Sequence, residues 1–168
     1  MAATVTVQQV TGADAGTPTP ITNLRFNTDD TANPGTTNPL VKPAAGTNYS
    51  YAKTVYLNAD TTPSGTINNV KIYCDGAIGW TGCTLYIGTV GAYTEKAGTP
   101  GTTGNDDSVA TAPITDFTSV APKSVTGSLS NDATGRISDY VVMQVDLSTD
   151  AVAGTLAAET ITFQYDET

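Results

Sequence analysis

Short runs in which apolar and polar residues alternate recur along the chain, and Gly, Pro, Asn and Asp separate them. The run Thr4–Val10 alternates cleanly, and Glu159–Tyr165 places Ile161, Phe163 and Tyr165 on one side. Because successive side chains of a strand point to opposite faces, this alternation predicts strands with one buried face. About a fifth of the residues are threonine, which suits an exposed sheet face, and strong helix formers are scarce. The sequence therefore predicts an all-β fold.

The other predicted strands are Ile21–Phe26, Tyr49–Asn58, Asn69–Cys74, Cys83–Ile87, Ala112–Val120, Ser124–Leu129 and Ser138–Leu147. We expect 69–74 and 83–87 to pair as a hairpin across the Gly-rich turn between them. Residues 29–47 and 97–107 are rich in turn-forming residues and are predicted loops, and 151–158 is turn-like. About eight strands without substantial helix predict one two-sheet β-sandwich over residues 1–168, of jelly-roll or Greek-key type.

The net charge of −9 limits the partners that the chain can have. An acidic surface opposes binding to nucleic-acid phosphates and to an anionic membrane, and it suits a well-solvated particle surface. No apolar run reaches the length of a transmembrane helix, and Met1 is not followed by the basic-then-apolar pattern of a signal peptide. We therefore expect synthesis in a cytoplasm, release by another route such as lysis, and neither nucleic acid nor membrane as a partner.

Catalytic signatures are missing from the sequence. There is no histidine, which is the commonest general base, and no nucleophile or phosphate-binding glycine motif. A pair of carboxylates could still hydrolyse glycosides, and the candidates are Asp75, Asp116, Asp139, Asp146 and Glu159. Sugar-cleaving sites usually also carry several aromatic side chains, whereas this chain has one Trp and three Phe. We predict a non-enzymatic protein without a cofactor.

Three acidic doublets, Asp29-Asp30, Asp106-Asp107 and Asp166-Glu167, are the only candidates for cation binding. None has the ligand spacing of an EF-hand loop. Solvated loop charge is the favoured interpretation, so no metal site is predicted.

Three aromatic residues are candidate contacts for a partner or a glycan: Trp80, Tyr73 and Tyr86. Trp80 lies in the turn 79–82, where it could stack on a sugar or anchor a partner, or could cap one end of the sandwich. Alternation places Tyr73 and Tyr86 on the outward face of the expected hairpin. There they could pair across the strands or contribute to an interface.

The two cysteines, Cys74 and Cys83, are separated by eight residues. If the flanking strands form a hairpin, the two thiols could come close enough for a disulfide. Two free, small and buried thiols are the favoured alternative, as is common for proteins made in a cytoplasm. Two cysteines without histidine do not make up a zinc site.

Several phrases of the sequence resemble small virion structural proteins of tailed bacteriophages. They are Asn38-Pro-Leu-Val-Lys-Pro43 leading into Gly46–Tyr51, Thr62–Lys71 continuing to Asp75-Gly76, and the closing segment Glu159–Glu167. The resemblance covers most of the chain in outline. It consists of turn and strand phrases, so it transfers no site residue.

The resemblance implies a β-sandwich that decorates a capsid, located in the virion and bound to the major capsid protein or other virion proteins. Such proteins commonly form homo-oligomers, and a trimer is favoured. Residues 1–20 and 29–47 are then candidate extended arms, because an extended segment can add to a partner's sheet edge. Two alternatives stay open: a tail, neck or fibre component of the virion, and a carbohydrate-binding or adhesin-like β-sandwich.

Overall fold

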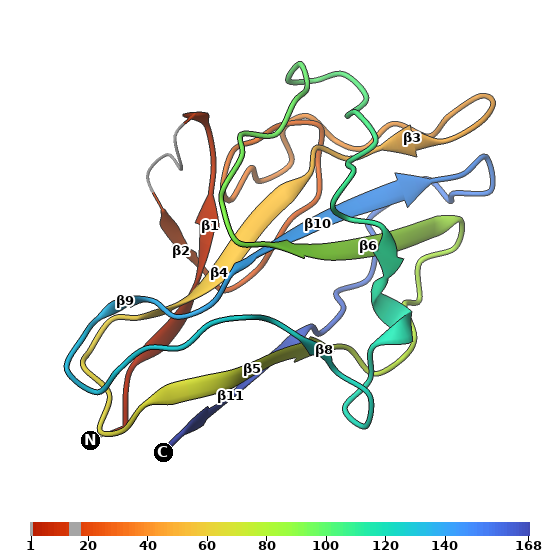
Figure 1. The fold of residues 1–168 in the computed structure, drawn as a ribbon. Helices are drawn as coiled ribbons and strands as arrows, with labels where there is room; N and C mark the ends of the chain where they lie inside the picture. Colours follow the sequence, from red (N-terminus) through yellow and green to blue (C-terminus); the bar gives the residue numbers. More distant parts are fainter. Residues whose placement is uncertain (1, 14–17) are drawn as a thin grey trace.

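Two antiparallel sheets pack face to face in the computed structural model, which describes residues 2–13 and 18–168 (Figure 1). The strands are β1 (Val5–Val10), β2 (Thr19–Ile21), β3 (Asn48–Tyr49), β4 (Lys53–Ala59), β5 (Ile67–Tyr73), β6 (Cys83–Val90), β7 (Ala112–Pro113), β8 (Lys123–Ser124), β9 (Gly135–Arg136), β10 (Tyr140–Leu147) and β11 (Thr162–Glu167). The larger sheet has the order β2-β1-β4-β10-β6-β7, with β3 beside β10 and β9 beside β4. The smaller sheet has the order β11-β5-β8. The predicted all-β, two-sheet sandwich is confirmed.

The hydrophobic core fills the space between the two sheets. Alternate residues of β4, β6 and β10 face it from the larger sheet, and residues of β5 face it from the smaller one. The completely or almost completely buried members include Val55, Leu57, Ile67, Ile72, Leu85, Ile87, Val141, Met143 and Val145. The period-two pattern of the sequence therefore identified the inward-facing positions of these strands correctly.

The predicted hairpin between 69–74 and 83–87 is wrong. Strand β5 pairs with β11 and β8 in the smaller sheet, whereas β6 pairs with β10 and β7 in the larger one. The connection 74–82 thus crosses from one sheet to the other. Alternation shows only that each strand buries one face. Two strands can bury these faces equally well as neighbours in one sheet or as members of two sheets that face each other across the core.

Other predicted strands are shorter or divided. The single strand expected at 49–58 is two strands, β3 and β4, which pair with different parts of β10. Strand β2 ends at Ile21, although Leu24 and Phe26 beyond it pack against the core as the pattern predicted. Residues 112–120 contain only β7 and the 3-10 turn Ile114–Asp116.

Strand β10 is buried on both faces, which the alternating pattern did not predict. Its outward-facing Val142 and Gln144 are 0% and 1% exposed, because the segment 94–111 covers this part of the larger sheet. The close approach depends on Gly88, since a Cβ at this position would overlap the backbone of Val109. The loop expected at 97–107 is therefore an irregular cover of the sheet.

Both candidate arms contribute to the sandwich over much of their length. Within 1–20, residues 5–10 are strand β1, which pairs with β4 along its length and with β2 in part; Met1 and 14–17 lie outside the described residues. The segment 29–47 contains no strand, as predicted. It is bound to the rest of the fold through Lys53, and Leu40 packs against the core.

Candidate functional site

The three aromatic residues singled out in the sequence do not form a shared platform. Tyr73 and Tyr86 belong to different sheets, so they do not pair across a hairpin. Tyr73 lies opposite Thr162 of β11, and Tyr86 lies opposite Gln144 of β10. Trp80 is partly buried against the core. Its indole N–H donates to the carbonyl oxygen of Ala157 at 2.7 Å, and its ring meets Phe26 edge to face. Trp80 therefore caps one end of the sandwich.

Both cysteines are free thiols in the structure. Cys74 is buried among core residues, and its sulfur lies 3.5 Å from the carbonyl oxygen of Ile114. Cys83 is only partly buried, and burial raises the pKa of its thiol. Since the two residues belong to strands of different sheets, the hairpin on which the candidate disulfide depended does not exist.

The acidic doublets stabilise loops and chain ends. Asp29 accepts a hydrogen bond from the side-chain amide of Asn38 at 2.9 Å, and Asp166 accepts one from Asn69 at 2.7 Å. Asp107 accepts from Lys96 and from two backbone N–H groups. Among the described residues, no three acidic or cysteine side chains are grouped so that they could hold a metal ion.

A polar cavity of about 310 Å³ lies beneath the segment 94–111. Lys96, which is 9% exposed, forms an ion pair of 3.0 Å with Asp107 at its wall. Burial acts to raise the pKa of Asp107, but hydrogen bonds from Lys96 and from the backbone outweigh it and hold this pKa below its ordinary value. The charged groups of this cavity therefore hold two parts of the covering segment to each other.

Two further titratable groups have strongly shifted pKa values. Burial lowers the pKa of Lys53 to about 8, and its ammonium donates to the backbone carbonyl oxygens of Asp29 and Thr31. Burial, aided by the charge of Asp106, raises the pKa of Asp146 to about 6. Lys53 is completely buried and fixes the start of the 29–47 segment, which gives it a structural role.

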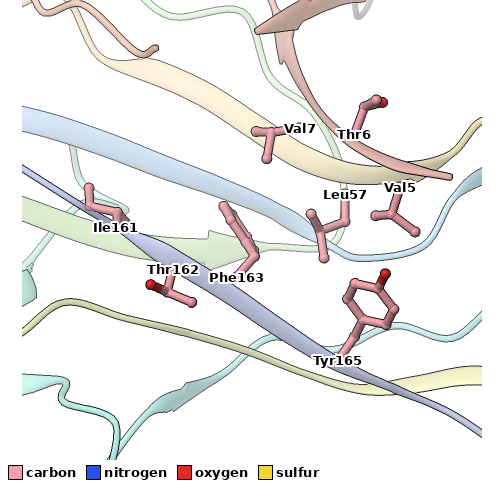
Figure 2. A pocket seen from close by; sticks show the side chains of 8 residues that line it. All are labelled: Val5, Thr6, Val7, Leu57, Ile161, Thr162, Phe163 and Tyr165. Carbon is pink, nitrogen blue, oxygen red and sulfur yellow. The ribbon is translucent and has the colours of Figure 1, made fainter. Parts of the chain in front are cut away.

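An apolar groove runs between the two sheets (Figure 2). Its volume is about 360 Å³, and its lining residues are Val5, Thr6, Val7, Leu57, Ile161, Thr162, Phe163 and Tyr165. Phe163 and Tyr165 of β11 face Val5, Val7 and Leu57 of the opposite sheet, whereas the side chain of Thr162 points away from them on the other side of β11 (Figure 2). All six apolar and aromatic side chains of this lining belong to the core or pack against it.

The groove follows an unpaired strand edge. Strand β11 is the last strand of the smaller sheet, and no strand among the described residues pairs with its outer edge. On the other side of the groove, β2 pairs only with residues 7–9 of β1, so the edge of β1 at Val5 and Thr6 is also without a strand. Unpaired edges offer backbone donors and acceptors to a further strand.

The other sheet edges carry features that discourage pairing. Strand β2 contains Pro20, and β7 contains Pro113. Strand β8 has only two residues and contains Lys123. Short edges, prolines and lysines each block the addition of another strand. Strand β11 is six residues long and contains no Pro, Lys or Arg. Its register with β5 shifts between Gln164 and Asp166, and Asp166 and Glu167 are charged, so its first half, Thr162 to Gln164, is the part of this edge most open to a further strand.

One end of the groove is acidic. Glu167 accepts hydrogen bonds from the backbone N–H groups of Ser64 and Ala3, and Asp60 accepts one from Thr6. Hydrogen bonds from the Ser64 side chain and backbone hold the pKa of the exposed Glu167 below its ordinary value, so this carboxylate stays ionised at neutral pH. Glu167 is thus the carboxylate at this end of the groove, because Asp60 and Asp166 bond to the outward-facing side chains of Thr6 and Asn69.

Sequence reasoning did not identify this groove, although it assigned three of its lining residues as inward-facing. Ile161, Phe163 and Tyr165 were predicted to point inward, and they do pack against the core. Whether these residues lie on an edge strand depends on which strands pair with β11. The strand that pairs with it is β5, which lies about 90 residues earlier in the chain.

No family model matches the sequence, no curated protein matches it, and no solved structure resembles the fold at a significant level. No helix in the described part of the chain is long and apolar enough to cross a membrane.

Proposed function

We propose that this chain is a non-enzymatic structural protein of a tailed-phage virion that decorates the outer surface of the head and stabilises it. The observation that carries the proposal is the apolar groove along the open edge of β11. Its volume of about 360 Å³ is near the lower end of small-molecule sites, which span roughly 300–1,000 Å³. A long apolar groove beside an unpaired strand suits a protein partner better than a small substrate.

The arrangement of the charged groups supports a structural role. Lys53 holds the 29–47 segment against strand β4, and the ion pair of Lys96 with Asp107 holds together two parts of the segment 94–111. The groove itself contains no carboxylate, amine or thiol among its lining side chains. Catalysis by general acids and bases needs such groups within reach of a bound substrate.

The net charge and the sequence phrases complete the proposal. A charge of −9 keeps a protein displayed at high density on a particle in solution and disfavours unwanted association. The phrases shared with small phage virion proteins point to the major capsid protein as the partner and to a homo-oligomer, with a trimer favoured. A tail or neck position is the alternative within the same virion.

The test is co-sedimentation with heads assembled from the major capsid protein encoded in the same genome. Light scattering first gives the oligomeric state of the isolated protein. We expect saturable binding at a fixed number of copies per head and a higher melting temperature of the decorated heads. A protein that ignores heads but binds cell-wall glycans would refute the proposal and favour a carbohydrate-binding module.

A further inference from the structure

The groove between β1 and β11 has the shape and chemistry of a site for one added strand. An extended segment beside β11 would pair with its unpaired backbone edge and would point every second side chain inward. The inward side chains would meet Val5, Val7, Phe163 and Tyr165, which are apolar and lie on both walls (Figure 2). The segment that fits is therefore apolar at alternate positions.

Charge decides which kind of chain can supply this segment. The groove ends beside the carboxylate of Glu167, and the whole chain carries a net charge of −9. A second copy would carry the same net charge of −9 and would be repelled as a whole, which disfavours the pairing of two β11 edges. A neutral or acidic segment gains nothing there, whereas a segment with lysine or arginine at its flank gains attraction.

We infer that the open edge of β11 captures an extended segment of a partner protein that is apolar at alternate positions and basic at the end beside Glu167. The captured segment becomes a fourth strand of the smaller sheet. Backbone hydrogen bonds to β11 give affinity, and the apolar walls and the Glu167 carboxylate give selectivity for sequence and direction. This inference rests on the proposed function, because it describes how a virion partner is held.

The experiment measures binding of a fluorescein-labelled peptide, Lys-Lys-Thr-Val-Thr-Val-Thr-Val-Thr, by fluorescence anisotropy on the intact protein. One control peptide carries Glu in place of both Lys, and another carries Pro in place of two Val. We expect the basic peptide to bind about tenfold more tightly than the acidic one, with the difference shrinking at high salt. The proline peptide should not bind, because it cannot complete the backbone ladder.

Two protein variants locate the site. Thr162→Lys places a lysine at the start of the open edge strand β11, and Ser124→Lys makes the same charge change on β8, at the opposite edge of the same sheet. We expect Thr162→Lys to weaken peptide binding about tenfold or more and Ser124→Lys to leave it unchanged. Independently of any variant, amide hydrogens of residues 162–165 should exchange more slowly when the basic peptide is bound to the wild-type protein.

Several outcomes would overturn the inference. They are absence of peptide binding, equal binding of all three peptides, and unchanged amide exchange in β11. A wild-type dimer that Thr162→Lys converts to monomers would assign the groove to a second copy instead. If the Thr162→Lys variant bound phage heads as tightly as the wild type, the inference about the groove would be wrong, but the proposed decoration role would be unaffected. If the wild type bound the peptide but not phage heads, the decoration role would be wrong, but the inference about the groove would be unaffected.

Discussion

Replacing Gln144 by Leu tests how the segment 94–111 is held on the larger sheet. The side chain of Gln144 is 1% exposed and makes three hydrogen bonds. Its Nε2 donates to the carbonyl oxygens of Ser50 at 2.9 Å and Asn105 at 2.6 Å, and its Oε1 accepts from the backbone N–H of Asp107 at 2.9 Å. Leu has a similar volume, so the substitution removes the polar contacts and keeps the packing.

The structure gives the size of the effect. A buried polar group left without a partner costs about 1–3 kcal/mol. Asn105 is exposed, so its carbonyl regains water, whereas Ser50 is completely buried and Asp107 is partly buried. Two orphaned groups, offset in part by burial of the apolar leucine, predict a loss of about 2–4 kcal/mol in the free energy of unfolding.

Urea denaturation followed by fluorescence of the single tryptophan, Trp80, measures this loss. Gln164→Leu is the matched control, because Gln164 is exposed on β11 and should change stability by less than about 0.5 kcal/mol. If Gln144→Leu also changed the free energy of unfolding by less than about 0.5 kcal/mol, the hydrogen bonds to the covering segment would not be what holds it.

Three further predictions concern titration and thiol state. The folded-state pKa of Asp146 is raised to about 6, so between about pH 4 and 6 the folded chain binds more protons than the unfolded chain and its stability falls as the pH rises. Asp146→Asn should therefore stabilise the protein at pH 7 by about 1 kcal/mol after allowance for solvent screening, and unchanged thermal unfolding would contradict this. The folded-state pKa of Lys53 is lowered to about 8, so the wild type should gain stability relative to Lys53→Met as the pH rises from 8 to 9.5; parallel pH profiles of melting temperature would refute it. Alkylation of the unreduced, denatured protein should add two groups by mass spectrometry, one at Cys74 and one at Cys83, whereas no addition would indicate a disulfide.

The sequence predicted the layers of this fold better than its pairings. Alternation identified the inward residues of β10 and β11, including Val141, Met143 and Phe163, because burial on one face imposes a period of two wherever the strand lies. The same alternation could not distinguish a β5–β6 hairpin from the observed crossing between sheets. Both arrangements bury Ile72 and Leu85 equally well.

The candidate site illustrates the same division. Three residues that line the groove, Ile161, Phe163 and Tyr165, were visible in the sequence as inward-facing positions of the last strand. The burial of Gln144 and the pairing of Lys96 with Asp107 were not visible, because they depend on where the segment 94–111 comes to rest. The assignment of strands to sheets was also needed to show that three aromatic residues do not share one surface; they are Trp80, Tyr73 and Tyr86.

The sequence by itself determined that the chain is all-β, that it forms one sandwich, and which side of each long strand faces inward. These properties follow from local preferences and from the two-residue period of a strand, which each segment carries independently. Only the tertiary structure decided which strands are neighbours, which edge stays open and where the groove lies. Those choices depend on contacts between residues far apart in the chain, such as Gln164 with Lys71, and no local pattern encodes them.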